Sequence, residues 1–205
     1  MLSTDDAEAC ETWLQRHMYV EEAVPFVLLG LDCEWVANFN GSDVPGGVSV
    51  VQLASATHCM VFSLGRGMPE LLRRTLLDPR VLKVGKGLAS DWRLLSSLLR
   101  PTDAPPASPV ERSTARWIER WGWFELCDFL PFSSDHASMD SLSRTFLGSS
   151  YALKGSVDHS QWDRWPLTAE QVHYASSDAC VIVDVLLAVA DRERREVACL
   201  TSEDK

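Results

Sequence analysis

Hydrophobic and polar residues follow two different periodicities along this chain. Short continuous apolar runs bounded by turn-forming or charged residues predict buried strands, at 26–31, 48–54, 59–63, 81–84 and 124–127. Segments with apolar residues at helical spacing predict helices, at 2–19, 69–77, 88–99, 139–147 and 169–196. Strands in the first half, with helices interleaved and then gathered at the end, predict an α/β or α+β domain on one mixed sheet.

The predicted elements fit a single domain of 205 residues. An N-terminal segment at 1–24, whose helix begins at Ser3 or Thr4, precedes the core at 25–190, and the last residues, 197–205, are expected to form a tail. Residues 101–122 contain several prolines followed by arginines, which predicts a surface insertion and not a second domain.

Composition excludes several classes of protein. The longest apolar stretch in the last helix is interrupted by Asp184, so no membrane span is expected. Acidic residues near the start do not suit a secretory or transit signal, which predicts an intracellular protein, nuclear or cytoplasmic. The six cysteines show no zinc-binding spacing. The net charge of −10 argues at first against a nucleic-acid partner, because phosphate binding depends on clustered Lys and Arg.

Two carboxylates follow the first apolar run directly. Alternation along a strand places Asp32 and Glu34 on the same face, at the end of a buried element. An Asp-x-Glu triplet alone is common on solvated surfaces, but the carboxyl end of a central strand is where open α/β sheets place ligands. The pair is therefore a candidate site.

A second candidate acid follows the strand predicted at 81–84. Gly85 and Gly87 allow a sharp turn into the next helix, so Asp91 is expected near the helix start and facing the end of the sheet. An ordinary first-turn Asp, favoured by the helix dipole, is the alternative reading.

The last helix carries a third group of polar residues. Thr168 and Gln171 form a capping box that predicts the helix start. At 3.6 residues per turn, Tyr174 and Asp178 lie about 40° apart around the helix, whereas His173 is about 140° from Asp178.

These three motifs, in this order, resemble the DEDD superfamily of 3′ to 5′ exonucleases, in the tyrosine branch that includes ribonuclease D and Werner-type exonuclease domains. The matching strings are LDCEWV, KVGKGLASDWRLL and WPLTAEQVHYASSDA, within a likeness that covers about residues 24–190. The resemblance implies a ribonuclease-H-like fold, a mixed β-sheet flanked by α-helices. It also implies a metal-dependent nuclease that removes nucleoside 5′-monophosphates from the 3′ end of DNA or RNA. The insertion at 101–122 departs from the family pattern.

The resemblance also implies a role for each acid. Asp32 would bridge two Mg2+ or Mn2+ ions, Glu34 and Asp178 would complete the site that holds the attacking water, and Asp91 would hold the second ion. Oxygen ligands suit these cations, and two bound ions offset part of the negative charge. Tyr174 would orient the water, because a phenol with a pKa of about 10 is a poor general base. His173 occupies the position of the histidine of the sibling branch, but the continuous helix favours Tyr174.

Other residues near the motifs are candidates for substrate contact. Trp35, like Phe39, can stack on a terminal base or pack in the core. Basic residues near the motifs can follow the nucleic-acid backbone or belong to the solvated surface: Lys83, Lys86, Arg93, Lys154 and Arg164. Trp162 and Trp165 are expected in the core.

Two other readings compete with the exonuclease. A nuclease-like fold can serve as a non-catalytic scaffold that binds nucleic acid or protein, with the insertion as its contact surface. A scaffold has no physical reason to keep four mutually repelling carboxylates together with the tyrosine. A ribonuclease-H-like endonuclease is the third reading, and the tyrosine-containing helix disfavours it.

Overall fold

The computed structural model describes residues 1–17, 26–36, 47–99, 121–131, 137–148 and 157–203, with side chains up to residue 196. Six strands form one mixed sheet in the order β1-β4-β3-β2-β5-β6. Their bounds are Leu2–Thr4 (β1), Val27–Trp35 (β2), Val48–Ala54 (β3), Cys59–Ser63 (β4), Val81–Gly85 (β5) and Trp123–Glu125 (β6). The pairs β2/β3 and β3/β4 are antiparallel, and β1/β4, β2/β5 and β5/β6 are parallel.

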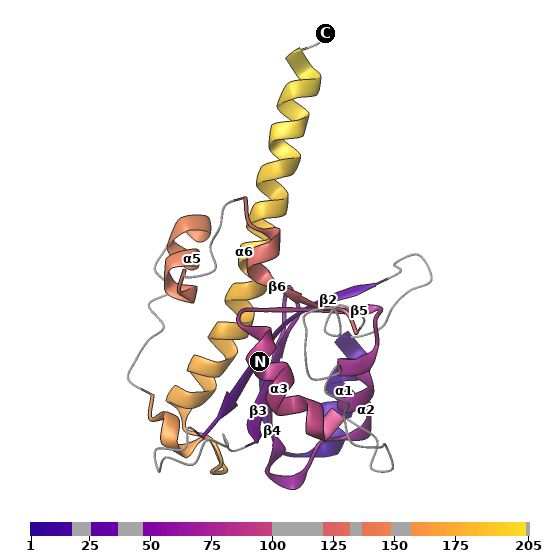
Figure 1. The fold of residues 1–205 in the computed structure, drawn as a ribbon, viewed down its shortest axis with the longest axis vertical. Coiled ribbons are helices and arrows are strands. Elements are labelled where there is room, and N and C mark those ends of the chain that lie inside the picture. The colour runs from indigo at the N-terminus through magenta and orange to yellow at the C-terminus, as the bar shows by residue number, and fades with distance from the viewer. Residues whose placement is uncertain (18–25, 37–46, 100–120, 132–136, 149–156, 204–205) are drawn as a thin grey trace.

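Helices cover both faces of this sheet (Figure 1). The helices are α1 (Ala7–His17), α2 (Glu70–Leu77), α3 (Leu88–Leu99), α5 (Met139–Leu147) and α6 (Ala169–Glu203). Helices α1, α2 and α3 share one buried apolar cluster with alternate residues of the central strands, among them Leu29, Leu31 and Leu53. Helix α6 packs on the other face against β2, β3 and β4, and α5 packs on α6. The mixed sheet flanked by helices is the predicted fold class.

Several predicted boundaries need correction. Residues 2–4 are not the start of a helix but form β1, an edge strand paired in parallel with β4, and α1 begins at Ala7. Asp6 stabilises that start, because its Oδ1 accepts a hydrogen bond from the Ala9 amide at 2.8 Å. The strand predicted at 124–127 is shorter, since the short 3-10 helix Leu126–Phe129 follows β6.

The C-terminal end also differs from the prediction. Helix α6 continues to Glu203 and projects beyond the rest of the domain in Figure 1, so residues 197–203 are helix and not tail. By length and composition alone, Ala169–Glu196 is apolar enough to cross a membrane, but half of its apolar stretch is buried within the domain. The predicted insertion at 101–122 lies outside the described residues apart from 121–122.

Candidate active site

The central strand β2 carries the first two candidate acids. Asp32 and Glu34 alternate with Leu31 and Cys33, which belong to the buried apolar cluster on the opposite face of the sheet. The acids therefore lie on the face of the sheet that α6 covers. The strand continues to Trp35, so both carboxylates lie within β2, in register with β3, and not beyond its end.

A glycine in β2 allows α6 to approach this strand closely. A Cβ atom built on Gly30 would lie 2.9 Å from Val183 Cγ2 and even closer to the backbone oxygen of Ala179. Real Cβ atoms essentially never approach other atoms below 3.0 Å, so only glycine fits without a shift of α6. Because Ala179 directly follows Asp178, this contact sets the distance between Asp178 and the acids of β2.

The start of α6 is defined as its sequence predicts. Thr168 and Gln171 exchange hydrogen bonds: the Thr168 amide donates to Gln171 Oε1 at 2.9 Å, and the Gln171 amide donates to Thr168 Oγ1 at 3.2 Å. The helix is continuous from there, so Tyr174 and Asp178 lie one turn apart and line the same cavity. His173 is exposed and is not among the residues that line it.

The cavity between β2 and α6 has a volume of about 350 Å³. It is lined by Asp32, Cys33, Glu34, Lys86, Gly87, Met139, Tyr174, Asp178 and Ile182. One carboxylate oxygen each from Asp32, Glu34 and Asp178 lies within 4.8 Å of the other two. Three hard oxygen ligands at such spacing fit a divalent cation such as Mg2+ or Mn2+.

Burial and mutual repulsion oppose the charged form of Asp32 when no cation balances it. Burial raises the pKa of Asp32 well above its ordinary value, and the nearby charges of Glu34, Asp91 and Asp178 raise it further. Burial, followed by the Asp178 and Glu34 charges, likewise raises the pKa of Tyr174, whose hydroxyl donates a hydrogen bond to the Asp178 carboxylate. A bound cation would reverse this preference and keep the carboxylates charged.

Asp91 lies next to this cluster but is not one of its three members. Its side chain is only 3% exposed and does not line the cavity, although its charge acts on Asp32. Gly85 allows α3 to begin close to the sheet, because a Cβ atom there would lie 2.9 Å from Leu88 Cγ at the start of α3. Thus the structure groups three of the four predicted acids closely and places the fourth within electrostatic reach.

A fifth acid, which the motifs do not contain, caps the start of α3 near Asp91. Glu125, at the end of β6, accepts hydrogen bonds from the Gly87 amide at 2.9 Å and the Leu88 amide at 3.2 Å. Its carboxylate thereby satisfies amides that the first turn of α3 leaves free. Burial, and then the charge of Glu125, raises the pKa of Asp91 to about 7.

The aromatic side chains of His159 and Trp162 pack against Tyr174. The ring of His159 meets the ring of Tyr174 edge-on at a centroid distance of 5.3 Å, and the Trp162 indole N–H donates to His159 Nδ1 at 3.2 Å. Trp162 is fully buried, as expected for a core residue. Trp165, by contrast, is 40% exposed, so its assignment to the core is wrong. The chain turns outward after Trp162, before the helix start at Thr168.

Of the residues predicted to contact substrate, only some lie where the structure forms the acidic cavity. Lys86 lines the cavity, whereas Trp35 is half-buried against the cluster that contains α1, α2 and α3. Lys154 lies outside the described residues.

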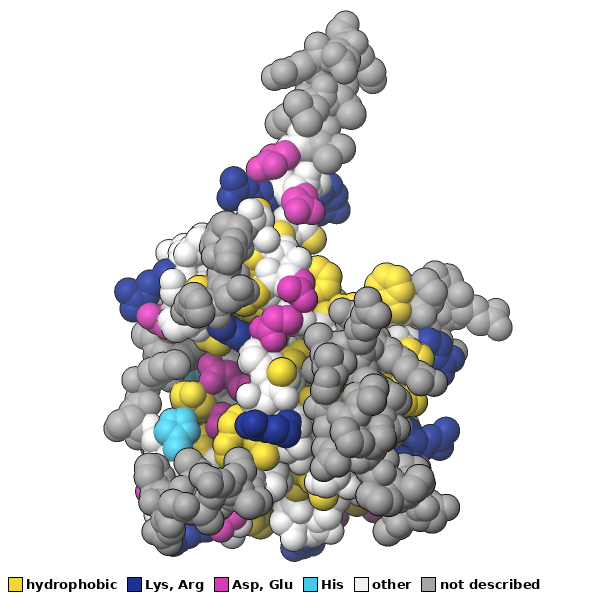
Figure 2. Space-filling view, in the orientation of Figure 1, with side chains coloured by type: hydrophobic (Ala, Val, Ile, Leu, Met, Phe, Trp, Pro, Cys, Tyr) yellow, Lys and Arg dark blue, Asp and Glu magenta, His cyan; other side chains and the backbone are white. Residues whose placement is uncertain are grey.

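Lys83 cannot follow a nucleic-acid backbone. It is completely buried, and its Nζ donates to the backbone oxygens of Thr75, Asp78 and Trp121. This lysine ties α2 and the segment before β6 to β5, so the expectation of an exposed cation is wrong. On the face shown in Figure 2, the described basic residues form no continuous band that would guide nucleic acid.

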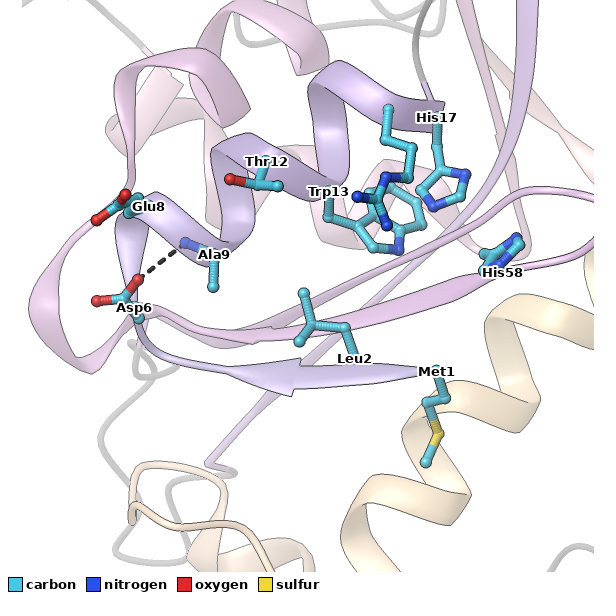
Figure 3. Close-up of a pocket in the computed structure, with 10 residues that line it drawn as sticks. Met1, Leu2, Asp6, Glu8, Ala9, Thr12, Trp13, His17 and His58 are labelled. Carbon is cyan, nitrogen blue, oxygen red and sulfur yellow. Dashed lines mark hydrogen bonds between the residues drawn. The ribbon is translucent and has the colours of Figure 1, made fainter.

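A larger cavity of about 530 Å³ lies elsewhere, between α1 and β1 (Figure 3). Trp13, His17 and His58 line one end of it, and Asp6 and Glu8 lie at the other. Asp6 is engaged in capping α1, as the dashed line in Figure 3 shows. Among the described residues that line this cavity, no three acidic, histidine or cysteine side chains are close enough to share a cation. Volume alone therefore does not identify the site.

Several known proteins resemble this chain in sequence or in fold. Mouse exonuclease 3'-5' domain-containing protein 2 is 31% identical over 184 residues, which is 85% of this chain but only 26% of the mouse protein. The catalytic core of RRP6 from Trypanosoma brucei superposes with a TM-score of 0.65 at 18% identity, covering 98% of this chain and 48% of that one. Ribonuclease D from Trypanosoma brucei, in complex with RNA U12, has a TM-score of 0.62 at 17% identity and covers 92% and 60%.

The solved structures establish likeness of fold, and the sequence match extends to the motifs. A family model described as 3'-5' exonuclease matches residues 3–191, which include β2, the start of α3 and the acidic part of α6. With that match over nearly its whole length, the chain belongs to the 3'-5' exonuclease domain family.

Proposed function

We propose that this protein is a metal-dependent exonuclease that hydrolyses phosphodiester bonds from the 3′ end of DNA or RNA and releases nucleoside 5′-monophosphates. The observation that carries the proposal is the grouping of Asp32, Glu34 and Asp178 within 4.8 Å in a cavity that Tyr174 also lines. Family membership supports nuclease chemistry, and the related ribonuclease D has been solved with RNA. The chain spans about a quarter of the length of its mouse relative.

The placement of the acids supports the roles proposed for them. Asp32, Glu34 and Asp178 would hold one divalent cation, and Asp32 together with Asp91 would hold a second. Mg2+ or Mn2+ ions would supply an activated water and stabilise charge on the attacking and leaving oxygens. Buried carboxylates that repel one another destabilise the folded state unless cations compensate them, so a cation-binding role explains why the chain keeps them together. A scaffold that only binds partners does not require that arrangement.

Tyr174 is proposed to position the attacking water. Its hydroxyl donates to Asp178 in this structure, and burial raises its pKa, so it keeps its proton at neutral pH. A protonated phenol can donate to, or accept from, a water held beside Asp178. The water oxygen attacks phosphorus as the bond to the 3′ oxygen of the preceding nucleotide breaks. That oxygen then takes up a proton and becomes the new 3′ hydroxyl end.

Incubation with end-labelled oligonucleotides tests the proposal. DNA and RNA strands labelled at the 5′ end are incubated with wild type and Asp32→Asn in Mg2+ or Mn2+, and products are resolved by length. Wild type is expected to give a ladder shortened from the 3′ end and Asp32→Asn none. Asp128→Asn, a change at an exposed acid outside the cavity, is the matched control and should cleave as wild type does. Equal cleavage by wild type and Asp32→Asn would reject the site.

A further inference from the structure

The buried amide of Gln52 has no hydrogen-bond partner. This side chain is completely buried in the middle of β3, and neither Oε1 nor Nε2 is satisfied. Among the described residues, these are the buried side-chain polar atoms left without a partner. Buried polar groups in proteins are nearly always paired, because an unpaired donor or acceptor loses its hydration without compensation. An orphaned amide in the centre of a sheet therefore needs an explanation.

The position of Gln52 in the sheet provides one. Gln52 is the direct cross-strand partner of Asp32 in the antiparallel pair of β2 and β3. Its neighbours two residues away, Val50 and Ala54, pack in the cluster under α6, so Gln52 points to the same side of the sheet as the acidic cavity. On its other side Gln52 pairs with Val61 of β4, which offers no polar side-chain atom.

Distance and chemistry favour Asp32 as the intended partner. Direct cross-strand neighbours have Cβ atoms about 4.5–5.5 Å apart, which a glutamine side chain spans easily. A glutamine Nε2 is a donor, and an ionised carboxylate is the strongest acceptor available to it. Carboxylates that hold metal ions are typically fixed by hydrogen bonds from residues that do not touch the metal.

We propose that Gln52 is a positioning residue for Asp32, whose ionised carboxylate it holds through a hydrogen bond from Nε2 when divalent cations are bound. The inference rests on the proposed function, because it assigns Asp32 to the cations. Gln52 does not touch substrate or cation in this account. Its effect on the reaction passes through the orientation of one carboxylate. The unpartnered amide thus lies directly opposite the carboxylate that it is proposed to hold.

Gln52→Met separates this role from a structural one. Methionine has a similar length and removes both polar atoms, so the cation-free variant should melt higher than wild type, by about 2 to 4 °C. Affinity for Mn2+, measured by calorimetry, and kcat on a labelled oligonucleotide should each fall by about 10- to 100-fold. KM for the oligonucleotide should stay the same, because Gln52 does not contact it.

Val61→Ala is the matched control. It truncates the neighbour on the other side of Gln52, in the same apolar cluster, and should lower the melting temperature while Mn2+ affinity and kcat stay at wild-type values. A Gln52→Met variant with wild-type Mn2+ affinity and kcat would overturn the proposal, whether its melting temperature rises or falls. A lowered melting temperature with unchanged Mn2+ affinity would instead indicate that a buried water satisfies the amide.

A measurement on wild type keeps the proposal testable if the variant does not fold. In 15N-labelled protein, addition of Mg2+ should shift the Gln52 side-chain NH2 resonances and slow their exchange with solvent. Unchanged resonances at saturating Mg2+ would overturn the proposal. Failure of the proposed function has a different signature, in which wild type binds Mn2+ but leaves oligonucleotides intact. In that case Mn2+ affinity still decides the role of Gln52.

Discussion

Replacement of Gly30 by alanine tests how the site is assembled, because this glycine sets the approach of α6 to β2. The added Cβ would lie 2.9 Å from Val183 Cγ2 and nearer still to the Ala179 backbone oxygen, whereas ordinary contacts begin at 3.4 Å. The Ala179 oxygen belongs to the α6 backbone and cannot rotate away. Relief of the clash therefore requires α6 to move by about 1 Å.

The displacement has separable effects on stability and activity. Overpacking of this size costs about 1–3 kcal/mol, which for a domain of this length lowers the melting temperature by roughly 2 to 12 °C. A catalytic group misplaced by about 1 Å can cost on the order of 100-fold in rate. Since Asp178 directly precedes Ala179, we expect Gly30→Ala to lose about 100-fold in kcat while it remains folded at 20 °C.

Circular dichroism melting and single-nucleotide release from a labelled oligonucleotide measure the two effects. Gly65→Ala is the matched control, because its Cβ would meet only the Ser63 hydroxyl oxygen at 3.7 Å, an ordinary contact. It should keep wild-type kcat. A Gly30→Ala variant that melts lower yet retains full kcat would refute the link between this contact and the placement of Asp178.

Three further predictions concern individual groups of the site. Tyr174→Phe should lower kcat by on the order of 100-fold. His173→Ala, at an exposed position, should keep kcat within about twofold of wild type. The reverse ranking in steady-state kinetics would assign the positioning of the water to His173. Burial raises the pKa of Asp91 to about 7, and that of Asp32 is raised as well, so the folded protein keeps protons that the unfolded chain releases above about pH 4. Urea unfolding of the cation-free protein should therefore show a free energy of unfolding that falls as pH rises from about 4 to 7. Saturating Mg2+ should restore the free energy of unfolding at pH 8. A free energy of unfolding that does not change with pH would contradict the raised pKa values of the buried acids. Glu125→Gln removes the charge beside Asp91 and weakens the cap on α3. Thermal melting should therefore show a loss of about 0.5–2 kcal/mol in the free energy of unfolding, and titration should show a lower pKa of Asp91. An unchanged pKa of Asp91 would exclude an effect of the Glu125 charge on it.

Local signals in the sequence predicted most of the site. The apolar run before Asp32 defines β2, and the capping box at Thr168 defines the start of α6, because each signal lies within a few residues of the element it shapes. The predicted bounds of α3 coincide with the observed helix Leu88–Leu99 for the same reason: a glycine turn precedes it and a proline follows it.

The features that sequence reasoning missed depend on contacts between distant segments. Strand β1 has three residues, too few to show a period, and its pairing is with residues 60–62. Gln52 and Glu125 acquire their neighbours from strand register and from the packing of α3, neither of which a single sequence displays. A single amide side chain within an otherwise largely apolar strand is nevertheless a local signal that Gln52 has a special role.

For Lys83, ignorance of contacts between distant segments led to a wrong prediction and not to a missed feature. A lysine near candidate catalytic residues suggests an exposed cation, but in the folded chain its ammonium group donates to three backbone oxygens, two at the end of α2 and one in the segment before β6. Gly30 is a further case, since a glycine inside a strand indicates close approach of another backbone without naming it. Here the approaching backbone is that of α6.

Anomalous diffraction from crystals grown with Mn2+ tests the central claim most directly, because manganese is located without reference to any assumed mechanism. The account predicts two peaks about 3.5–4 Å apart, one within ligand distance of Asp32, Glu34 and Asp178 and the other shared by Asp32 and Asp91. Strong manganese peaks elsewhere on the protein, with none near Asp32, would contradict it.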